Sequence, residues 1–466
     1  MLFNSVHFLL FFPVVCALSF CWRSVRSRNL FLLLASYYFY MNWQPVYALL
    51  LLTSTLITYF AALLMAKSEL HSVRRRLWLA LSIVLNLSIL FLFKYYQFVA
   101  DNVTALFCHW GIHLGLPEFP WLLPVGISFY TFQALGYAID VYRGNISAER
   151  NPITYALFIS FFPQLVAGPI ERSPHLLPQF KKWHPFSYDD AMTGLKWMLW
   201  GYFLKLALAD RCGIYVDAIY NNLAYHNGTS YLIASLLFPF QIYGDFAGYS
   251  LTAIGAARVM GFRLMENFRR PYFAATVSEF WRRWHISLST WFKDYVYIPL
   301  GGNRVSRPRG YFNVMMTMTI SGIWHGANWS FIVWGILHGL MQCIEKMLGL
   351  GRASFRGIRR WVHVIITFLW VSAAWVFFRA DSLSDAVTVL TGICLRPGVP
   401  KINLADWMAA GVALLILFAK EWRDERGGGE TVERSRFGEH VRLALMCAYL
   451  LLLGVLNGDQ FIYFQF

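Results

Sequence analysis

The sequence predicts an all-α, polytopic membrane protein, and its composition and the lengths of its apolar runs carry this prediction. Of the 466 residues, 58% are hydrophobic and only 14% are charged, whereas soluble domains are roughly half apolar and about a quarter charged. The apolar residues gather in runs close to the ~20 residues that a helix needs to cross a bilayer. Lipid is therefore the expected solvent for much of the surface. The aromatic share of 18% is typical of chains with interfacial belts.

Twelve apolar runs are expected to form the spanning helices. They cover residues 3–22, 29–42, 45–66, 77–99, 121–142, 191–209, 231–257, 311–324, 327–348, 361–378, 403–419 and 441–457. Two of them, 29–42 and 311–324, are short for a full crossing. When the basic loops are placed in the cytoplasm, one alternation accommodates all twelve runs, and both termini then lie on the outer face.

The net charge of +15 is explained by where the cations lie. They fall in short loops between apolar runs, such as the loop with Arg23, Arg26 and Arg28 and the loop with Lys67 and residues 74–76. This is the pattern of cytoplasmic loops in membrane proteins. We therefore expect the lipid bilayer, and not nucleic acid, to be the partner of these charges.

Two regions do not fit simple spans. Residues 152–170 contain Pro163, Gly168 and Pro169 and are flanked by basic loops, so we expect a re-entrant segment there. Residues 258–310 combine ten Lys and Arg with three Asp and Glu and many aromatics. That mixture predicts helices that lie in the cytoplasmic interface or dip into it.

His325, in "SGIWHGANW", is the strongest candidate for chemistry. If 311–324 is helical from the cytoplasmic side, a rise of ~1.5 Å per residue carries His325 about 20 Å into the membrane. An ionisable group at that depth is costly and usually functional. Gly322 and Gly326 would leave room for another molecule to approach. The alternative is a structural histidine hydrogen-bonded between helices, and this is the role that we expect for His338.

His285 lies in a second aromatic and basic segment, "EFWRRWHISLSTWF". One interpretation is an interfacial helix whose arginines meet lipid headgroups. The functional interpretation is a polar lining for the mouth of a cavity, where Arg282 and Arg283 would favour an anionic ligand.

Other kinds of site lack their motifs. There is no HExxH motif, so no metal is expected, and no GxSxG elbow indicates a serine triad. The seven cysteines are scattered, which argues against a disulfide framework. The first apolar run starts at Met1 without a basic segment or a small-residue cleavage site, so we interpret it as a retained span.

The motifs closely resemble those of the membrane-bound O-acyltransferase family. The matching stretches, in the family's order, are "LPVGISFYTFQALGYAIDVYRG", "FFPQLVAGPIER", "YGDFAGYS", "MGFRLMENF", "FWRRWHISLSTWFKDYVYIPLGGNR", "SGIWHGANWSFIVWG" and the terminal "FIYFQF". The resemblance covers nearly the whole chain. It is to the bacterial branch that O-acetylates cell-surface polysaccharides such as alginate and peptidoglycan, and more distantly to the membrane subunit of teichoic-acid D-alanylation.

This resemblance implies a fold and a set of roles. The fold would be a single integral-membrane domain over residues 1–466, with about 11–12 spanning helices and re-entrant and interfacial helices around a central funnel. Its acyl-transfer core would cover about 120–350, followed by a last span and tail at 441–466. His325 matches the family's catalytic histidine and His285 its second functional histidine.

The acyl donor follows from the same resemblance. Its contacts follow from charge, because acetyl-CoA carries several phosphates and residues 258–309 are the densest basic aromatic region of the chain. Acetyl-CoA is the expected acyl donor, and no other cofactor is expected. Arg282 and Arg283 would hold this donor or shape its entrance from the cytoplasm. We assign substrate binding also to Trp324 and Asn328, which lie close to His325 in the sequence.

The tail "FIYFQF" contains Tyr463, which we expect to relay the acetyl group to the outside. A phenol is a better leaving group than a sugar hydroxyl, so an acetyl-tyrosine stays activated. The resemblance implies a periplasmic SGNH-type partner with a serine nucleophile, and a location in the bacterial inner membrane. The other interpretation of the tail is an aromatic belt.

Two other classes of function remain open from the residues alone. A transporter or flippase would suit twelve spans, but the sequence has no two-fold repeat, and its main intramembrane acids are Asp140 and Asp245. A scaffold that only recruits soluble partners would leave the buried histidines unexplained. Acetyl-CoA turnover by the purified protein would separate acyl transfer from both.

Overall fold

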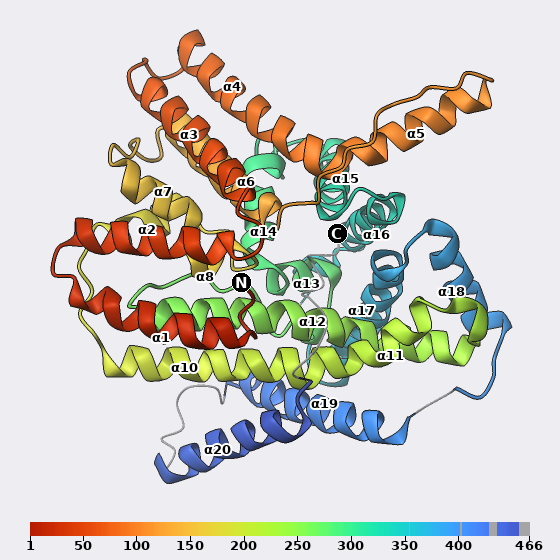
Figure 1. The fold of residues 1–466 in the computed structure, drawn as a ribbon. Coiled ribbons are helices and arrows are strands. Elements are labelled where there is room, and N and C mark those ends of the chain that lie inside the picture. Colours follow the sequence, from red (N-terminus) through yellow and green to blue (C-terminus); the bar gives the residue numbers. More distant parts are fainter. Residues whose placement is uncertain (354, 401–402, 428–435, 456–466) are drawn as a thin grey trace. The chain divides into compact units, whose positions relative to one another are not determined.

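All regular secondary structure in the computed structural model is helical, as the sequence predicts (Figure 1). The structure describes residues 1–353, 355–400, 403–427 and 436–455, and these residues form no strand. Each of the twelve apolar runs contains a helix. The contacts divide the chain into a first unit, Met1–Leu195 with Ala253–Met265, and a second unit, Lys196–Thr252 with Glu266–Phe466. The single domain expected from the sequence stays a prediction.

The first unit is built from the N-terminal helices. They are α1 (Val6–Cys21), α2 (Val25–Met41), α3 (Tyr47–Ala66), α4 (Val73–Leu90), η1 (Phe91–Tyr95), α5 (Tyr96–His109), α6 (Ile127–Arg143), α7 (Pro152–Ser160), α8 (Phe162–Leu165), α9 (Ser173–Phe180) and the start of α10 (Tyr188–Tyr202). Figure 1 shows α1 beside α2 and α3 beside α4. The run predicted at 77–99 is much longer in the structure, because helix continues from Val73 to His109.

Two arginines that we expected in cytoplasmic loops are instead buried within helices of the first unit. Arg75 of α4 donates hydrogen bonds to the carbonyls of Val141 and Tyr142 at the end of α6, where a cation stabilises the unsatisfied carbonyls. The guanidinium of Arg28 in α2 lies 5.2 Å from the ring centre of Phe262. The loop assignment was therefore wrong for these two residues, because each side chain has an interior partner that the sequence does not reveal.

The segment 152–170 has the form expected of a re-entrant stretch. It forms two short helices, α7 and α8, which are separated at Phe161, where the backbone leaves the helical region (φ −53°, ψ 112°). At nine residues, α7 is only about 14 Å long, too short to cross a bilayer. Residues 161–170 are all buried, so protein shields their irregular backbone.

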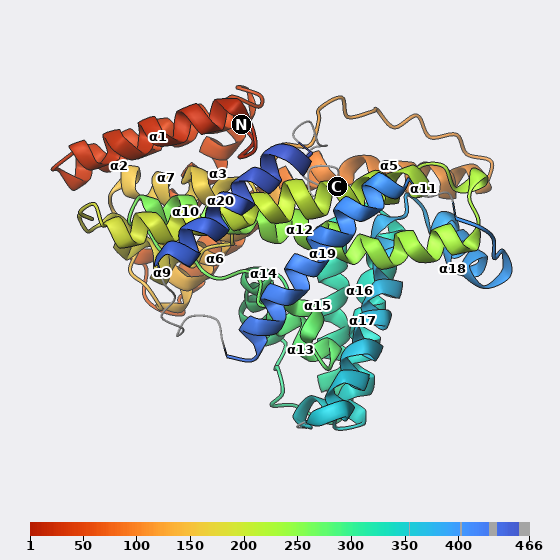
Figure 2. The ribbon, with the colours of Figure 1, turned by 90° about the horizontal axis from the view of Figure 1, so that it is seen from below.

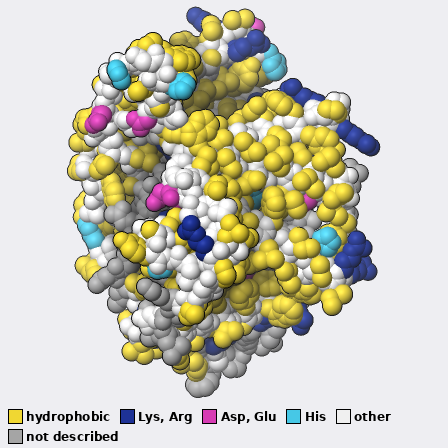
Figure 3. Space-filling view, turned by 90° about the vertical axis from the view of Figure 1, so that its right-hand side faces the viewer, with side chains coloured by type: hydrophobic (Ala, Val, Ile, Leu, Met, Phe, Trp, Pro, Cys, Tyr) yellow, Lys and Arg dark blue, Asp and Glu magenta, His cyan; other side chains and the backbone are white. Residues whose placement is uncertain are grey.

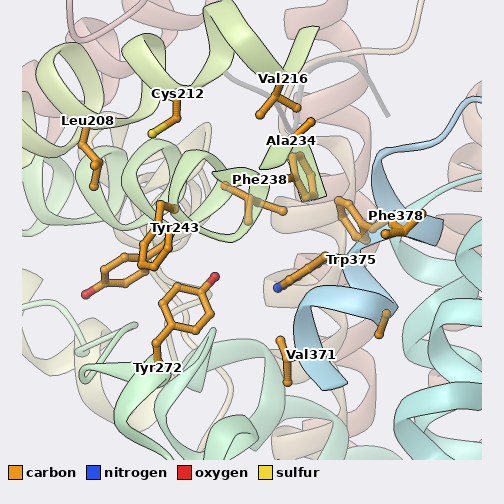
Figure 4. Close-up of a cluster of buried hydrophobic side chains, with 14 of the residues drawn as sticks. Leu208, Cys212, Val216, Ala234, Phe238, Tyr243, Tyr272, Val371, Trp375 and Phe378 are labelled. Atoms are coloured by element: carbon orange, nitrogen blue, oxygen red, sulfur yellow. The ribbon is translucent and has the colours of Figure 1, made fainter. Parts of the chain in front are cut away.

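The second unit holds the candidate site. Its elements are the rest of α10, η2 (Phe203–Ala209), α11 (Asp210–Tyr220), η3 (Leu223–Tyr225), most of α12 (Gly228–Val259), η4 (Pro271–Phe273), α13 (Val277–Arg283), α14 (Ile286–Phe292), η5 (Lys293–Tyr297), α15 (Arg307–His325), α16 (Trp329–Met347), η6 (Leu350–Arg352), α17 (Gly357–Arg379), α18 (Leu383–Leu395), α19 (Leu404–Glu425) and α20 (Arg436–Leu453). Figure 2 shows α15, α16 and α17 as neighbours. Their core includes Trp375 and Phe378 of α17 and Phe238 of α12 (Figure 4).

Glycines bring α15 and α16 into backbone contact. A Cβ atom on Gly322 would lie 2.3 Å from the carbonyl oxygen of Phe331, and one on Gly335 would lie 2.4 Å from that of Met318. Small residues allow such close packing of membrane helices. A Cβ on Gly326 would meet the Phe331 ring at 2.1 Å. The expectation that Gly322 and Gly326 leave room for another molecule was therefore wrong, because α16 fills that space.

Apolar side chains also cover outward faces, as expected for a protein in lipid. On α17 the exposed residues Ile358, Val362, Ile365 and Leu369 recur at helical spacing, while Trp375 is fully buried. Hydrophobic side chains predominate on the face shown in Figure 3. In the described part of the chain, three helices are long and apolar enough to span a membrane: 47–66, 73–109 and 357–379. That all twelve runs cross stays a prediction.

The glycine contact predicts a sharp difference between two single substitutions. Gly335→Ala should lower the free energy of unfolding by about 1–3 kcal/mol, because the new methyl group would overlap the backbone of α15. Gly411→Ala is the matched control, since a Cβ at Gly411 of α19 would meet no atom within 4 Å. Thermal unfolding in detergent measures both. Equal melting temperatures for the two variants would contradict the close approach.

Candidate active site

His325 is the last residue of α15 and is 3% exposed. The helix ends there because Gly326 is extended (φ −167°, ψ 156°). Aromatic rings surround the imidazole: the ring centres of Trp324 and Trp334 lie 4.9 Å away, and that of Phe378 lies 5.4 Å away. α15 is about 28 Å long. His325 is thus at the far end of a helix that begins in a basic segment, inside an enclosure of aromatic rings.

His285 is fully buried and lies beside His325, with 6.4 Å between the two ring centres. Its ring also packs on Phe246 at 4.6 Å. Residues 277–292 are largely buried, so an interfacial helix at the surface does not describe this segment. That His285 lines the mouth of a cavity stays a prediction. The aromatic residues of this segment pack inside the protein.

The backbone at His285 is strained. Its φ of 42° and ψ of 54° lie in the left-handed region, and they break the segment into α13 and α14. Side chains other than glycine rarely adopt this conformation, which costs about 1–3 kcal/mol. Such residues cluster at functional sites, where the surrounding structure holds them in place. The strain therefore marks His285 as a position that the fold maintains at a cost in stability.

The start of α13 is fixed by a buried carboxylate from α16. Glu345 accepts hydrogen bonds from the backbone N–H groups of Val277 and Ser278 and from the Ser278 hydroxyl. It therefore satisfies donors that a helix N-terminus leaves open and complements the helix dipole. The same α16 packs against α15, so both histidine-bearing segments are built on one helix.

His338 fits the structural role that we expected for it. The indole N–H of Trp281 donates to His338 Nδ1 at 3.3 Å. Trp334 lies between two histidines, because its ring centre is 4.9 Å from both His325 and His338. His338 is fully buried. Its contacts tie α13 to α16 behind the site.

The two neighbouring arginines have different surroundings. Arg283 donates to Glu279 at 2.7 Å and makes two bonds of 2.9 Å to Glu425, which also accepts from Arg270 and Arg360. Glu425 lies beyond the predicted span 403–419. Burial raises the pKa of its carboxyl group, but the hydrogen bonds from Arg283 and Arg270 lower this pKa by more, so that it is below its ordinary value.

Arg282 is exposed and makes no ion pair with the described residues. Arg283, by contrast, already has carboxylate partners. Of the two, Arg282 is therefore the one available to an anionic ligand.

The two residues that we assigned to substrate binding, Trp324 and Asn328, also have different surroundings. Trp324 is 4% exposed and contacts the rings of both His325 and His285. Asn328 instead caps α16: it accepts from the Ser330 N–H at 2.9 Å and donates to the Asp381 carbonyl at 2.8 Å. The geometry thus places Trp324 at the site, whereas it gives Asn328 a structural task.

A buried ion-pair cluster escaped the sequence analysis. Lys205 of η2 lies 2.7 Å from both Asp210 and Asp245, and the three side chains are at most 9% exposed. Asp245 was recognised as an intramembrane acid, but Lys205 was counted within the apolar run 191–209. A buried charge needs a partner, so a lysine in an apolar run followed by Asp210 was the signal that could have revealed the pair.

Two further expectations concern Tyr463 and a metal ion. Tyr463 lies outside the described residues. Among the residues that the structure describes, no group of three or more His, Cys, Asp and Glu side chains could hold a metal ion. The seven cysteines are free thiols.

The arrangement of His285 and His325 lies within a stretch that matches a known family. The family model for membrane-bound O-acyltransferases matches residues 37–381, about three quarters of the chain. The chain belongs to the membrane-bound O-acyltransferase family.

Similar proteins from three bacteria agree with this membership. A probable alginate O-acetylase AlgI from Pseudomonas aeruginosa is 41% identical over 388 residues, covering 83% of this chain and 73% of that protein. A peptidoglycan O-acetyltransferase from Helicobacter pylori is 36% identical over 440 residues, covering 87% and 82%. A teichoic acid D-alanyltransferase from Bacillus subtilis is 28% identical over 272 residues, covering 54% and 68%.

As a membrane-bound O-acyltransferase, the chain is a multi-pass membrane enzyme that transfers acyl groups to oxygen. Family membership decides among the classes of function that the residues alone left open, in favour of acyl transfer over a transporter or a scaffold. The matched region includes His285, His325 and His338, and it ends before Tyr463.

Proposed function

We propose that this enzyme moves an acetyl group from cytoplasmic acetyl-CoA across the inner membrane to a periplasmic SGNH-type partner with a serine nucleophile. The partner then O-acetylates a cell-surface polysaccharide of the peptidoglycan or alginate type, the two acceptors named for the relatives above. Both termini lie in the periplasm. The observation that carries the proposal is the buried pair His285 and His325, with ring centres 6.4 Å apart.

The chemical step needs a base and a place for negative charge. An acceptor hydroxyl oxygen attacks the thioester carbonyl carbon while His325 takes the hydroxyl proton. His285 donates a hydrogen bond to the carbonyl oxygen as that oxygen becomes negative. The carbon–sulfur bond then breaks, and the leaving thiolate of coenzyme A receives the proton from His325. The aromatic rings around His325 keep water from hydrolysing the thioester.

The first test removes the base. His325→Ala should lower acetyl transfer by about 10²–10⁴-fold, the usual contribution of a general base, while the protein still inserts into the membrane and stays folded. The measurement is release of coenzyme A thiol by the purified chain. His363→Ala is the control, since His363 stacks on Phe355 outside the aromatic enclosure. Transfer at the wild-type rate by His325→Ala would rule out this role.

The second test separates the two arginines at the donor entrance. Arg282→Gln should raise KM for acetyl-CoA and leave the melting temperature unchanged, because Arg282 is exposed. Arg283→Gln should lower the free energy of unfolding by about 1–3 kcal/mol, because Glu425 and Glu279 lose charged partners. Steady-state kinetics measures KM, and thermal unfolding measures stability, for both variants. An unchanged KM in Arg282→Gln would point to headgroup anchoring instead.

In this proposal, the acceptor hydroxyl of the first transfer belongs to Tyr463. The phenol oxygen receives the acetyl group, and the resulting acetyl-tyrosine passes it to the serine of the periplasmic partner. The leaving phenolate is more stable than a sugar alkoxide, so the second transfer is favourable. The support is the resemblance of "FIYFQF" to the family's carrier motif and the predicted outer location of the C-terminus.

The third test removes only the phenol oxygen. Tyr463→Phe should reduce polysaccharide acetylation in cells to background while the amount of protein in the membrane stays constant. Mass spectrometry of wild-type chain incubated with acetyl-CoA should find one added acetyl group on the C-terminal peptide. Persistent acetylation in Tyr463→Phe would make the tail an anchor and not a carrier.

A further inference from the structure

A neighbouring segment runs alongside His285 and brackets it with backbone hydrogen bonds. The Arg269 N–H donates to the carbonyl of Arg283 at 2.8 Å, and the Ile286 N–H donates to the carbonyl of Asn267 at 2.9 Å. These bonds fix the backbone on both sides of His285. The pairing segment itself ends in a second left-handed residue, Arg270, with φ 46°.

The Asn267 side chain adds two more bonds at the start of α14. Its Oδ1 accepts from the Ser287 N–H at 3.3 Å and from the Ser287 hydroxyl at 2.8 Å. Its Nδ2 donates to the Ser250 hydroxyl on α12 at 3.0 Å. Asn267, Ser250 and Ser287 are each at most 1% exposed. Asn267 thus accepts hydrogen bonds from the first two N–H groups of α14, and its own side chain donates a hydrogen bond to α12.

We propose that Asn267 is a positioning residue that holds His285 in its strained conformation, with its imidazole beside His325. The inference rests on the proposed function, in which His285 takes part in the transfer. Residues at the start of a helix need acceptors for their N–H groups, and the residue before the helix normally supplies one. Here that residue is His285, whose side chain makes no such bond, so Asn267 supplies the acceptor from another segment.

This arrangement has a direct consequence for the imidazole. If the residue before α14 capped the helix with its own side chain, that side chain would point at the helix and not toward the site. An external cap leaves the His285 ring directed at Phe246, Trp324 and His325. Loss of the cap would let the backbone relax out of the left-handed region and carry the ring away from His325.

A double-mutant cycle tests the inference on the full chain in detergent, with thiol release from acetyl-CoA as the readout. Asn267→Ala should lower kcat by about 100-fold, since a small misplacement of a catalytic group has effects of this size, with little change in KM. In a His285→Ala background the same substitution should have no further effect on kcat. Asn267→Asp keeps the oxygen acceptors and should recover most of the rate, with a shifted pH profile because a carboxylate lies near His285.

Asn313→Ala is the matched control. Asn313 is also a fully buried asparagine, but it donates to the Gly302 carbonyl and touches neither histidine. Asn313→Ala should lower the melting temperature. Any decrease in kcat that it causes should be the same factor in the wild-type background and in the His285→Ala background. Independent effects of Asn267→Ala and His285→Ala would overturn the positioning role. A wild-type chain that releases no thiol would overturn the proposed function, and this inference with it.

Discussion

The contact between α15 and α16 is the constraint on which the rest of the site depends. Gly322 and Gly335 let two helix backbones approach so closely that a Cβ on either glycine would overlap a backbone carbonyl oxygen of the other helix. This contact places Trp334 of α16 against His325 of α15. One turn further along α16, His338 meets Trp281 of α13. Glu345 of the same helix caps α13. A shift between α15 and α16 would therefore move every part of the site.

The site combines an apolar enclosure with a few fully engaged polar groups. Indole and phenyl rings surround the two histidines, and charged side chains such as Lys205 and Arg283 are paired with carboxylates elsewhere in the second unit. Low local polarity strengthens any hydrogen bond made to a developing charge, and it makes an unpaired charge very costly. The same apolar environment thus requires that each buried ion have a partner.

The strained residue and the residues whose hydrogen bonds hold it in place lie in different segments of the chain. His285 has the unfavourable backbone conformation, while Asn267 and Glu345 supply hydrogen bonds on either side of it. Neither supporting residue belongs to the segment "EFWRRWHISLSTWF". A stable local helix through 277–292 would have removed the strain, but it would also have turned the imidazole along a different direction. The broken helix is therefore understandable as the means by which His285 and His325 come together.

The sequence by itself determined the helical membrane class and the family, and it singled out His325 and His285 as candidate catalytic residues. Composition, run lengths and contiguous motifs are local properties, and they are visible without a structure. Tertiary structure alone decided that Gly322 serves helix packing, that Arg75 and Arg28 are interior, that Arg283 is committed to Glu425, and that His285 lies beside His325. Each of these depends on a partner in another element, such as Phe331 for Gly322 or Glu425 for Arg283. Such pairings are set by how helices pack, because local sequence patterns specify which face is apolar but not which helix will cover it.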